Sequence, residues 1–221
     1  MGNFLVAVVP IRKGSVRVKN KNFKKFAGEN LLIHKIRILK KIKYLDDIII
    51  NTDSERAINI AKKLNVNYHK RTKYYASSKC SNSEFWKHIA KVTNSEFIMF
   101  TNCTSPMISL KTYIDFIRLF KKNYKKKDSF NTVTEMREFL FYKKKSLNFK
   151  TEKTPNSQDL PEVLKLNFAI NIISKNLMFK KKSLIGNRPL FHKLSEVEGY
   201  DINYPFEFNY AEYLFKKFRN K

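Results

Sequence analysis

The sequence predicts an α/β fold of three layers, in which helices cover both faces of a mostly parallel β-sheet. Two observations support this fold class. Up to residue 124, apolar segments of strand length alternate with segments whose apolar residues recur at helical spacing. The expected strands are apolar at nearly every position, which is typical of strands buried on both faces. A chain of 221 residues can bury one sizeable core, so we expect a single domain over residues 1–221.

The first half of the chain gives these signals in alternation. We expect strands at residues 4–9, 46–52, 66–69 and 96–101, and helices at residues 31–42, 54–65, 82–92 and 110–124. Ser54 is the candidate N-cap of the second helix. The faces expected to be buried contain Leu32, Ile36 and Leu39 in the first helix, Ala57, Ile58, Ala61 and Leu64 in the second, and Ile114, Ile117 and Phe120 in the last.

The second half is less regular. We expect strands at residues 129–136, 139–149 and 168–174, and a closing helix at residues 208–218. Residues 137–165 are polar and rich in lysine, which makes them a candidate for a small protruding subdomain.

The chain is strongly basic, with 45 Lys and Arg against 19 Asp and Glu, a formal charge of +26. Such a charge by itself indicates a polyanionic partner, either nucleic acid or an anionic membrane surface. Much of the excess lies in the lysine runs 125–127, 143–145 and 180–182, which we interpret as solvated turns and helix faces. A basic nucleic-acid-binding domain remains an alternative. The aromatic residues argue against it, because most fall on helix faces that we assign to the core.

The cysteines and the N-terminus indicate the compartment. Cys80 and Cys103 have no CxxC partner and no nearby histidine, so neither a zinc site nor a disulfide framework is expected. The apolar run at residues 4–9 lacks the basic flank and the length of a signal peptide, and no stretch approaches the ~20 apolar residues of a membrane span. We therefore expect a soluble, cytoplasmic protein, and we assign no role to its histidines.

The segment VVPIRKGSVRVKNKN, residues 8–22, joins the first strand to a basic loop. Ligands of parallel sheets bind beyond the carboxyl ends of the strands, where this loop lies. Gly14 is its only glycine, so backbone amides alone cannot form a phosphate cradle. The polar side chains that could neutralise a triphosphate are Arg12, Ser15, Arg17, Lys21 and Asn22. The alternative is a solvated basic loop.

Asp53 is open to two interpretations of equal weight. It ends the second strand at the ligand-binding edge, but Thr-Asp-Ser-Glu is also a good helix cap.

Six ordered blocks resemble the CMP-sialic acid synthetase (acylneuraminate cytidylyltransferase) family. The first is the basic loop, which is similar to that family's N-terminal signature. The others are IIINTDSE (48–55), Arg71 with YASSKCSNS (75–83), FTNCTSP (100–106), SQDLPEVLKLNFAINIIS (157–174) and YDINYPFEFNYAEYL (200–214). Together they cover most of the chain, which makes the resemblance more specific than any single block.

The resemblance implies a nucleotide-binding version of the three-layer fold and a CTP-dependent enzyme. Such an enzyme transfers CMP to an acidic 2-keto sugar of sialic, legionaminic or pseudaminic type and releases pyrophosphate, which activates the sugar for surface glycan synthesis. It also implies Mg²⁺, a homodimer with a small protruding dimerisation subdomain, and no specific nucleic-acid partner. Ketodeoxyoctonate and a phosphonate are the alternative acceptors.

The resemblance also implies roles for individual residues. Arg12, Lys21 and Asp201 are catalytic, the first two through the charge of the leaving pyrophosphate, and Asp201 with Asn203 holds the metal. The remaining substrate-binding candidates are Ser15, Arg17, Asn22, Arg71, Ser78, Ser81, Asn82, Asn102, Lys165 and Asn167, with Lys165 assigned to the sugar carboxylate.

Four positions depart from the family pattern. Asn102 replaces a Gln, Lys165 an Arg, Phe168 a Gly, and Asn203 the second carboxylate of an Asp-Ile-Asp motif. Asn102, Phe168 and Asn203 leave a cytidylyltransferase-like domain without activity as a further alternative.

Overall fold

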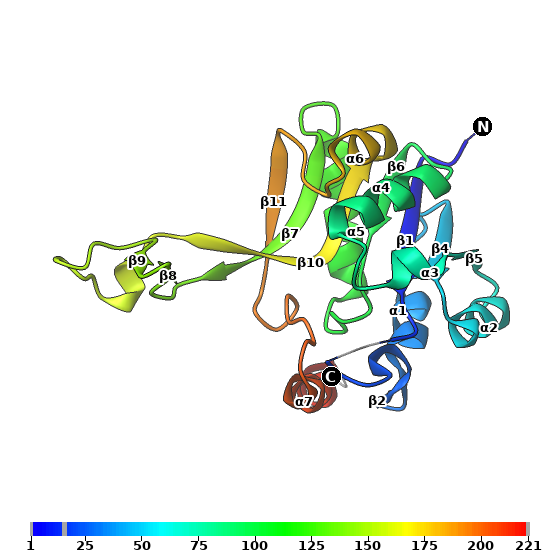
Figure 1. Ribbon diagram of the computed structural model, residues 1–221, viewed down its shortest axis with the longest axis horizontal. Coiled ribbons are helices and arrows are strands. Elements are labelled where there is room, and N and C mark those ends of the chain that lie inside the picture. The colour runs from blue at the N-terminus through cyan, green and yellow to red at the C-terminus, as the bar shows by residue number, and fades with distance from the viewer. Residues whose placement is uncertain (1, 15–16, 220–221) are drawn as a thin grey trace.

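A seven-stranded sheet forms the centre of the molecule, in the strand order β11-β7-β10-β6-β1-β4-β5 (Figure 1). The computed structural model describes residues 2–14 and 17–219. The strands are β1 (Leu5–Ile11), β4 (Asp47–Thr52), β5 (Asn67–Lys70), β6 (Phe97–Phe100), β7 (Ser129–Met136), β10 (Val163–Ser174) and β11 (Pro189–Leu194). Neighbouring strands pair in parallel except at β10, which is antiparallel to both β6 and β7. The mostly parallel sheet predicted from the sequence is confirmed.

Helices cover both faces of this sheet. They are α1 (Leu31–Leu39), α2 (Glu55–Lys63), α3 (Lys73–Ala76), α4 (Asn82–Val92), α5 (Leu110–Asn123), α6 (Lys175–Lys181) and α7 (Pro205–Arg219). Along β1, Leu5, Ala7 and Val9 point into one core with residues of α1, α2, α5 and α7, while Val6 and Val8 point into a second with α4 and α6. Because successive side chains of a strand alternate between faces, the apolar run of β1 serves two cores and gives three layers.

Local capping explains where several helices begin. Ser54 caps α2 by accepting a hydrogen bond from the backbone of Ala57, and Ser109 does the same for Thr112 at the start of α5. Ser81 opens α4 with a capping box to Glu84. These contacts use near neighbours in the sequence, so the helix starts were accessible to prediction.

The expected buried faces need two corrections. In α5 the buried residues are Tyr113, Phe116, Ile117 and Phe120, whereas Ile114 is only half-buried. In α2, Leu64 is likewise half-buried, because it stands at the C-cap rather than inside the helix.

Short elements around the loop after β1 were not predicted. They are the 3-10 helix η1 (Lys21–Phe23) and the strands β2 (Lys25–Phe26) and β3 (Glu29–Asn30), which pair with each other. The helices α3 and α6 and the strand β11 were also missed, because their apolar runs are too short or too irregular to show a period.

The segment between β7 and β10 forms an arm that projects from the body of the protein (Figure 1). Residues 139–149 are not the single strand expected from their apolar content. They fold into a hairpin of β8 (Phe141–Tyr142) and β9 (Lys145–Ser146), followed along the chain by the 3-10 helix η2 (Ser157–Asp159). Lys143 and Lys144 reverse the chain at φ 47° and 66°, the positive values that a tight two-residue hairpin turn requires.

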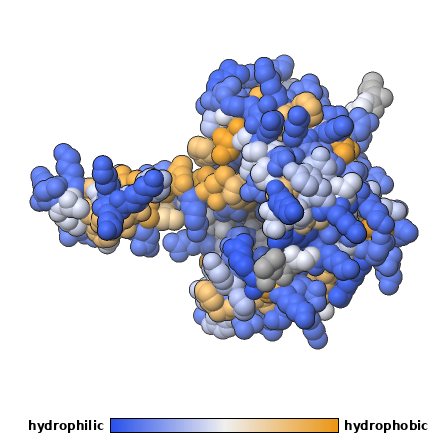
Figure 2. Space-filling view, viewed as in Figure 1, coloured by the Kyte–Doolittle hydropathy of each residue, from blue (hydrophilic) through white to orange (hydrophobic). Residues whose placement is uncertain are grey.

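The surface is largely hydrophilic, but apolar residues follow the arm (Figure 2). The exposed large side chains of this arm are Phe139, Phe141, Tyr142 and Leu147. Among residues 2–14 and 17–219, no helix is both long enough and apolar enough to cross a bilayer.

Candidate active site

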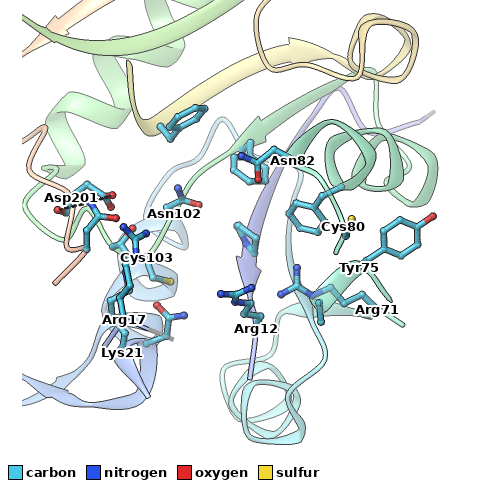
Figure 3. A pocket seen from close by; sticks show the side chains of 18 of the residues that line it. Arg12, Arg17, Lys21, Arg71, Tyr75, Cys80, Asn82, Asn102, Cys103 and Asp201 are labelled. Atoms are coloured by element: carbon cyan, nitrogen blue, oxygen red, sulfur yellow. Dashed lines mark hydrogen bonds between the residues drawn. The ribbon is translucent and has the colours of Figure 1, made fainter. Parts of the chain in front are cut away.

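A cavity of about 430 Å³ opens at the carboxyl ends of the central strands. Its walls come from the loop after β1, from Arg71 and the start of α4, from the loop after β6, from β10, and from the segment before α7. Figure 3 shows the labelled side chains in two groups across the cavity, with Arg17, Lys21, Asn102, Cys103 and Asp201 on one side and Arg12, Arg71, Tyr75, Cys80 and Asn82 on the other. Segments far apart in the sequence therefore meet at one site.

Arg71 is the most deeply held cation of this cavity, with only 6% of its surface exposed. Its guanidinium donates a 2.7 Å hydrogen bond to the carbonyl of Ile11 and lies over the ring of Phe85. Burial lowers the pKa of Arg71 to about 10, with the Asp53 carboxylate opposing the shift. Arg71 therefore stays charged at neutral pH and is fixed in position.

Asp53 supports the basic loop rather than capping a helix. Its Oδ1 accepts a 2.9 Å hydrogen bond from the backbone of Lys13 and lies 3.9 Å from Nη2 of Arg71. The cap of α2 is Ser54. Of the two interpretations of Asp53, the structure favours the one at the ligand-binding edge.

Lys21 and Asp201 bring opposite charges to the other side of the cavity. Lys21 donates through Nζ to the carbonyl of Ile202, the residue that follows Asp201. Burial lowers the pKa of Lys21 and raises that of Asp201, and the attraction between the two groups opposes both shifts. The backbone of Ile202 also donates to the carbonyl of Thr104, which ties this segment to the loop after β6.

The carboxylate of Asp201 has a free acceptor atom. Its Oδ2 accepts a 2.9 Å hydrogen bond from Nδ2 of Asn203, whereas its Oδ1 is buried without a hydrogen-bond partner among the described residues. The Thr104 side chain is near enough to lower the pKa of Asp201, but it does not reach hydrogen-bond geometry with either oxygen. Glu207 does not line the cavity, and its Oε2 accepts hydrogen bonds from the backbone amides of Asn203 and Tyr204. A cation near Asp201 would therefore find an unused oxygen there.

An apolar wall completes the cavity. Phe85 and Trp86 reach it from α4, Phe100 from the end of β6, and Phe168 from β10. The rings of Trp86 and Phe168 are stacked, with their centroids 6.1 Å apart. The resemblance did not assign these residues a role, although Phe168 was noted as a departure from the family pattern.

The structure brings most of the proposed site residues together. Those that line the cavity are Arg12, Arg17, Lys21, Asn22, Arg71, Asn82, Asn102, Asp201 and Asn203. Ser15 lies outside the described residues. Tyr75, Ser77, Cys103 and Thr104 also line it and were not proposed, although all four fall inside motifs that resemble the family.

Four proposed substrate-binding residues do not line the cavity. Ser78 is exposed, and Ser81 is engaged in the capping box of α4. Lys165 is exposed on β10 opposite Thr134 and does not line the cavity. Asn167 is buried, and its side-chain amide is occupied by hydrogen bonds with the hydroxyls of Thr132 and Thr134.

Comparison of the sequence with known protein families identifies the family of this chain. A family model described as Cytidylyltransferase matches residues 6–216. The chain belongs to the cytidylyltransferase family. The family resemblance seen in the sequence is thereby confirmed, and the protein is a CTP-dependent nucleotidyltransferase.

Two relatives of this cytidylyltransferase are informative. It is 22% identical over 229 residues to the "Post-translational flagellin modification protein B" of Campylobacter coli, a match that covers 96% of this chain and 95% of that protein. It is 28% identical over 118 residues to the N-acylneuraminate cytidylyltransferase of Escherichia coli O18:K1:H7, covering 53% of this chain and 28% of that protein.

A solved structure shows the same fold. This cytidylyltransferase superimposes on CMP:2-keto-3-deoxy-manno-octonic acid synthetase, solved in complex with CTP, with a TM-score of 0.69. The match has 11% sequence identity and covers 97% of this chain and 99% of the other.

Proposed function

We propose that this cytidylyltransferase transfers CMP from CTP to the hydroxyl of an acidic 2-keto sugar of sialic, legionaminic or pseudaminic type and releases pyrophosphate. The observation that carries the proposal is the cavity in which Arg12, Arg17, Lys21 and Arg71 converge, while Asp201 has a buried oxygen that makes no hydrogen bond within residues 2–14 and 17–219. The relative from Escherichia coli, an N-acylneuraminate cytidylyltransferase, supports an acceptor of this class.

The chain's own residues suit this reaction. The acceptor oxygen forms a bond to the α-phosphorus of CTP as the bond to the β-phosphate oxygen breaks, so negative charge moves onto the pyrophosphate. Arg12 and Lys21 supply fixed positive charge for that leaving group. Arg71 and Asn82, across the cavity, are proposed to hold the nucleotide.

We propose that Asp201 and Asn203 hold Mg²⁺. The described residues contain no group of three or more His, Cys, Asp or Glu side chains suited to a metal ion. Mg²⁺ is often held by only one or two carboxylates together with substrate phosphates, and the unpartnered Oδ1 of Asp201 fits that arrangement. When bound, the cation neutralises phosphate charge and polarises the groups that coordinate it.

The acceptor carboxylate needs another partner, since Lys165 lies outside the cavity. Arg17 and Asn102 lie on the same side as Asp201 (Figure 3) and are the candidates that we propose. Arg17 is positioned over the ring of Tyr204.

We also propose that the chain is a single domain whose residues 137–165 form a dimerisation subdomain, and that the enzyme acts in the cytoplasm as a homodimer. The exposed apolar side chains of the arm support the dimer, because large aromatic residues gathered on a projecting hairpin are typical of an interface.

Measuring pyrophosphate release tests the proposed reaction. With CTP and Mg²⁺, we expect release on addition of a nine-carbon keto-sugar acid, and little release with ketodeoxyoctonate, a phosphonate, or no acceptor. CTP should raise the melting temperature, since it binds only the folded protein. Selective release with ketodeoxyoctonate or the phosphonate would reassign the acceptor.

A salt titration separates this enzyme from the nucleic-acid alternative. Binding by diffuse charge should be lost as salt rises to ~0.2 M, whereas a partly buried site should retain CTP. RNA binding that persisted with sequence preference, without any thermal shift by CTP, would refute the enzyme proposal.

A further inference from the structure

Phe168 has a backbone conformation that residues with a side chain rarely adopt. Its φ is 55°, in the left-handed region, and it lies at the irregularity of β10 between Leu166 and Asn171. Glycine adopts this conformation freely, whereas a large aromatic residue is disfavoured there. Phenylalanine therefore makes this backbone conformation less stable than glycine would, and a favourable contact of its ring must offset that cost.

Buried polar contacts hold the chain in this shape on both sides of Phe168. Asn167 accepts hydrogen bonds from the hydroxyl of Thr132 and from the backbone of Ala169, at 2.7 and 3.2 Å. Thr101 donates a 2.7 Å bond to the carbonyl of Ala169. Strain that is held by its surroundings in this way is found mainly at binding sites.

The bulge directs the Phe168 ring into the cavity. There it stacks on Trp86 at an interplanar angle of 28°, so two elements distant in the sequence form one aromatic surface. Thr101, which contacts the bulge, directly precedes Asn102. The Phe168 end of the aromatic surface therefore adjoins the segment that contains Asn102, where we place the acceptor, and the Trp86 end lies one helical turn from Asn82 on α4.

We propose that Phe168, together with Trp86, determines acceptor specificity by contacting an apolar substituent of the sugar acid, such as the methyl of an N-acyl group or of a deoxygenated carbon. This inference rests on the proposed function and narrows its substrate class. A methyl group that packs against an aromatic face gives up no hydrogen bonds, whereas a hydroxyl placed there loses its hydrogen bonds to water. The enzyme then selects keto-sugar acids that carry an N-acyl group or a terminal methyl over acids that carry neither.

Steady-state kinetics of two variants test the proposal. We compare kcat/KM for an N-acylated nine-carbon acid with kcat/KM for ketodeoxyoctonate, which has neither an N-acyl group nor a methyl group. Wild type should favour the acylated acid, and Phe168→Gly and Phe168→Ala should each reduce that ratio roughly tenfold, the scale expected for one apolar contact. The KM for CTP and its thermal shift should stay as in wild type.

The two variants also separate the ring from the backbone. Both remove the ring, but only glycine suits a φ of 55°, so Phe168→Gly should melt at a higher temperature than Phe168→Ala. Lys182→Gly is the matched control, since Lys182 is an exposed residue with φ 53° at the end of α6. It should leave the acceptor ratio at the wild-type value.

The outcomes are distinct. A wild-type preference that survives in both Phe168 variants, or a wild type that prefers ketodeoxyoctonate, overturns the inference while leaving the cytidylyl transfer intact. Absence of pyrophosphate release with every keto-sugar acid refutes the proposed function, and this inference with it.

Discussion

The side-chain amide of Asn203 donates a 2.9 Å hydrogen bond to Oδ2 of Asp201. The pair stands where two carboxylates would otherwise lie side by side, and the amide removes one negative charge from the proposed metal site. The bond also leaves Oδ1 of Asp201 as the unused oxygen. This relationship leads to the first prediction.

Asp201→Ala should reduce turnover at least 10²-fold, because Asp201 lines the cavity whereas the neighbouring Glu207 does not, and Oε2 of Glu207 is engaged with backbone amides. Asn203→Asp should instead lower the Mg²⁺ concentration needed for half-maximal pyrophosphate release, by roughly tenfold, since a second carboxylate adds charge to the site. Asn209→Asp, an exposed change of the same charge on α7, is the control. An unchanged Mg²⁺ requirement in both site variants would place the metal elsewhere.

Arg12→Ala should leave the melting temperature nearly unchanged, because Arg12 lines the cavity and is not part of the apolar core. Turnover at saturating CTP should fall by roughly 10², the scale for losing one positioned charge. Lys13→Ala is matched to it, since the exposed side chain of Lys13 does not line the cavity. Normal turnover in Arg12→Ala would mean that the loop is only a solvated basic surface.

Tyr113→Phe should destabilise the fold without changing its packing. The Tyr113 hydroxyl accepts a 2.6 Å hydrogen bond from Nζ of Lys35, which is fully buried, and bonds to Thr101 at 2.8 Å. Removing it leaves a buried ammonium short of an acceptor, at a cost of about 2–4 kcal/mol in the free energy of unfolding. Thermal and urea unfolding would measure this loss.

The same pair can be tested by a double-mutant cycle. Lys35→Met removes the ammonium that needs the acceptor, so the double variant should lose less stability than the sum of the two single changes. Additive losses would show that Lys35 and Tyr113 are not coupled.

His88 should make the protein sensitive to acid. Burial lowers the pKa of His88 to about 4, with the charges of His69 and Arg71 adding to the shift. The unfolded chain has an ordinary pKa near ~6.5, so it binds the proton first, and stability falls as pH drops from about 6.5 towards 4. This group alone should cost at most about 2 kcal/mol at about pH 5, reduced by the water that screens its ring.

His88→Phe is the matching variant, because phenylalanine cannot titrate but keeps a ring against Tyr75. In the native protein the rings of His88 and Tyr75 are stacked, with their centroids 3.7 Å apart. Between pH 7 and pH 5, the melting temperature of wild type should fall further than that of His88→Phe. The difference between the two falls should be roughly 4–8 °C. Parallel pH profiles for the two proteins would show that His88 is not responsible.

The arm should control the oligomeric state. Phe141 and Leu147 are 57% and 62% exposed, so changing both to serine should not unfold the body of the protein. Sedimentation should show a dimer for wild type and a monomer for the double variant. Tyr210→Ser on α7, which is also exposed, serves as the comparison. A monomeric wild type would refute the dimer proposal.

Much of the fold was determined by signals that act over short distances along the chain. The apolar runs of β1 and β4, and the serines that begin α2, α4 and α5, settle their elements through neighbouring residues. The motifs at the strand ends likewise indicated the family, because such blocks keep their residue types in a fixed order. The match to the cytidylyltransferase family confirms that inference.

Only the tertiary structure decided which motif residues share the cavity. A bulge changes the face to which a side chain points, and periodicity does not reveal where a bulge occurs. This is why Asn167 turns to Thr132 and Thr134 and Phe168 enters the cavity. Trp86 meets Phe168 because α4 and β10 pack against the same hydrophobic core, a non-local contact with no trace in either sequence segment.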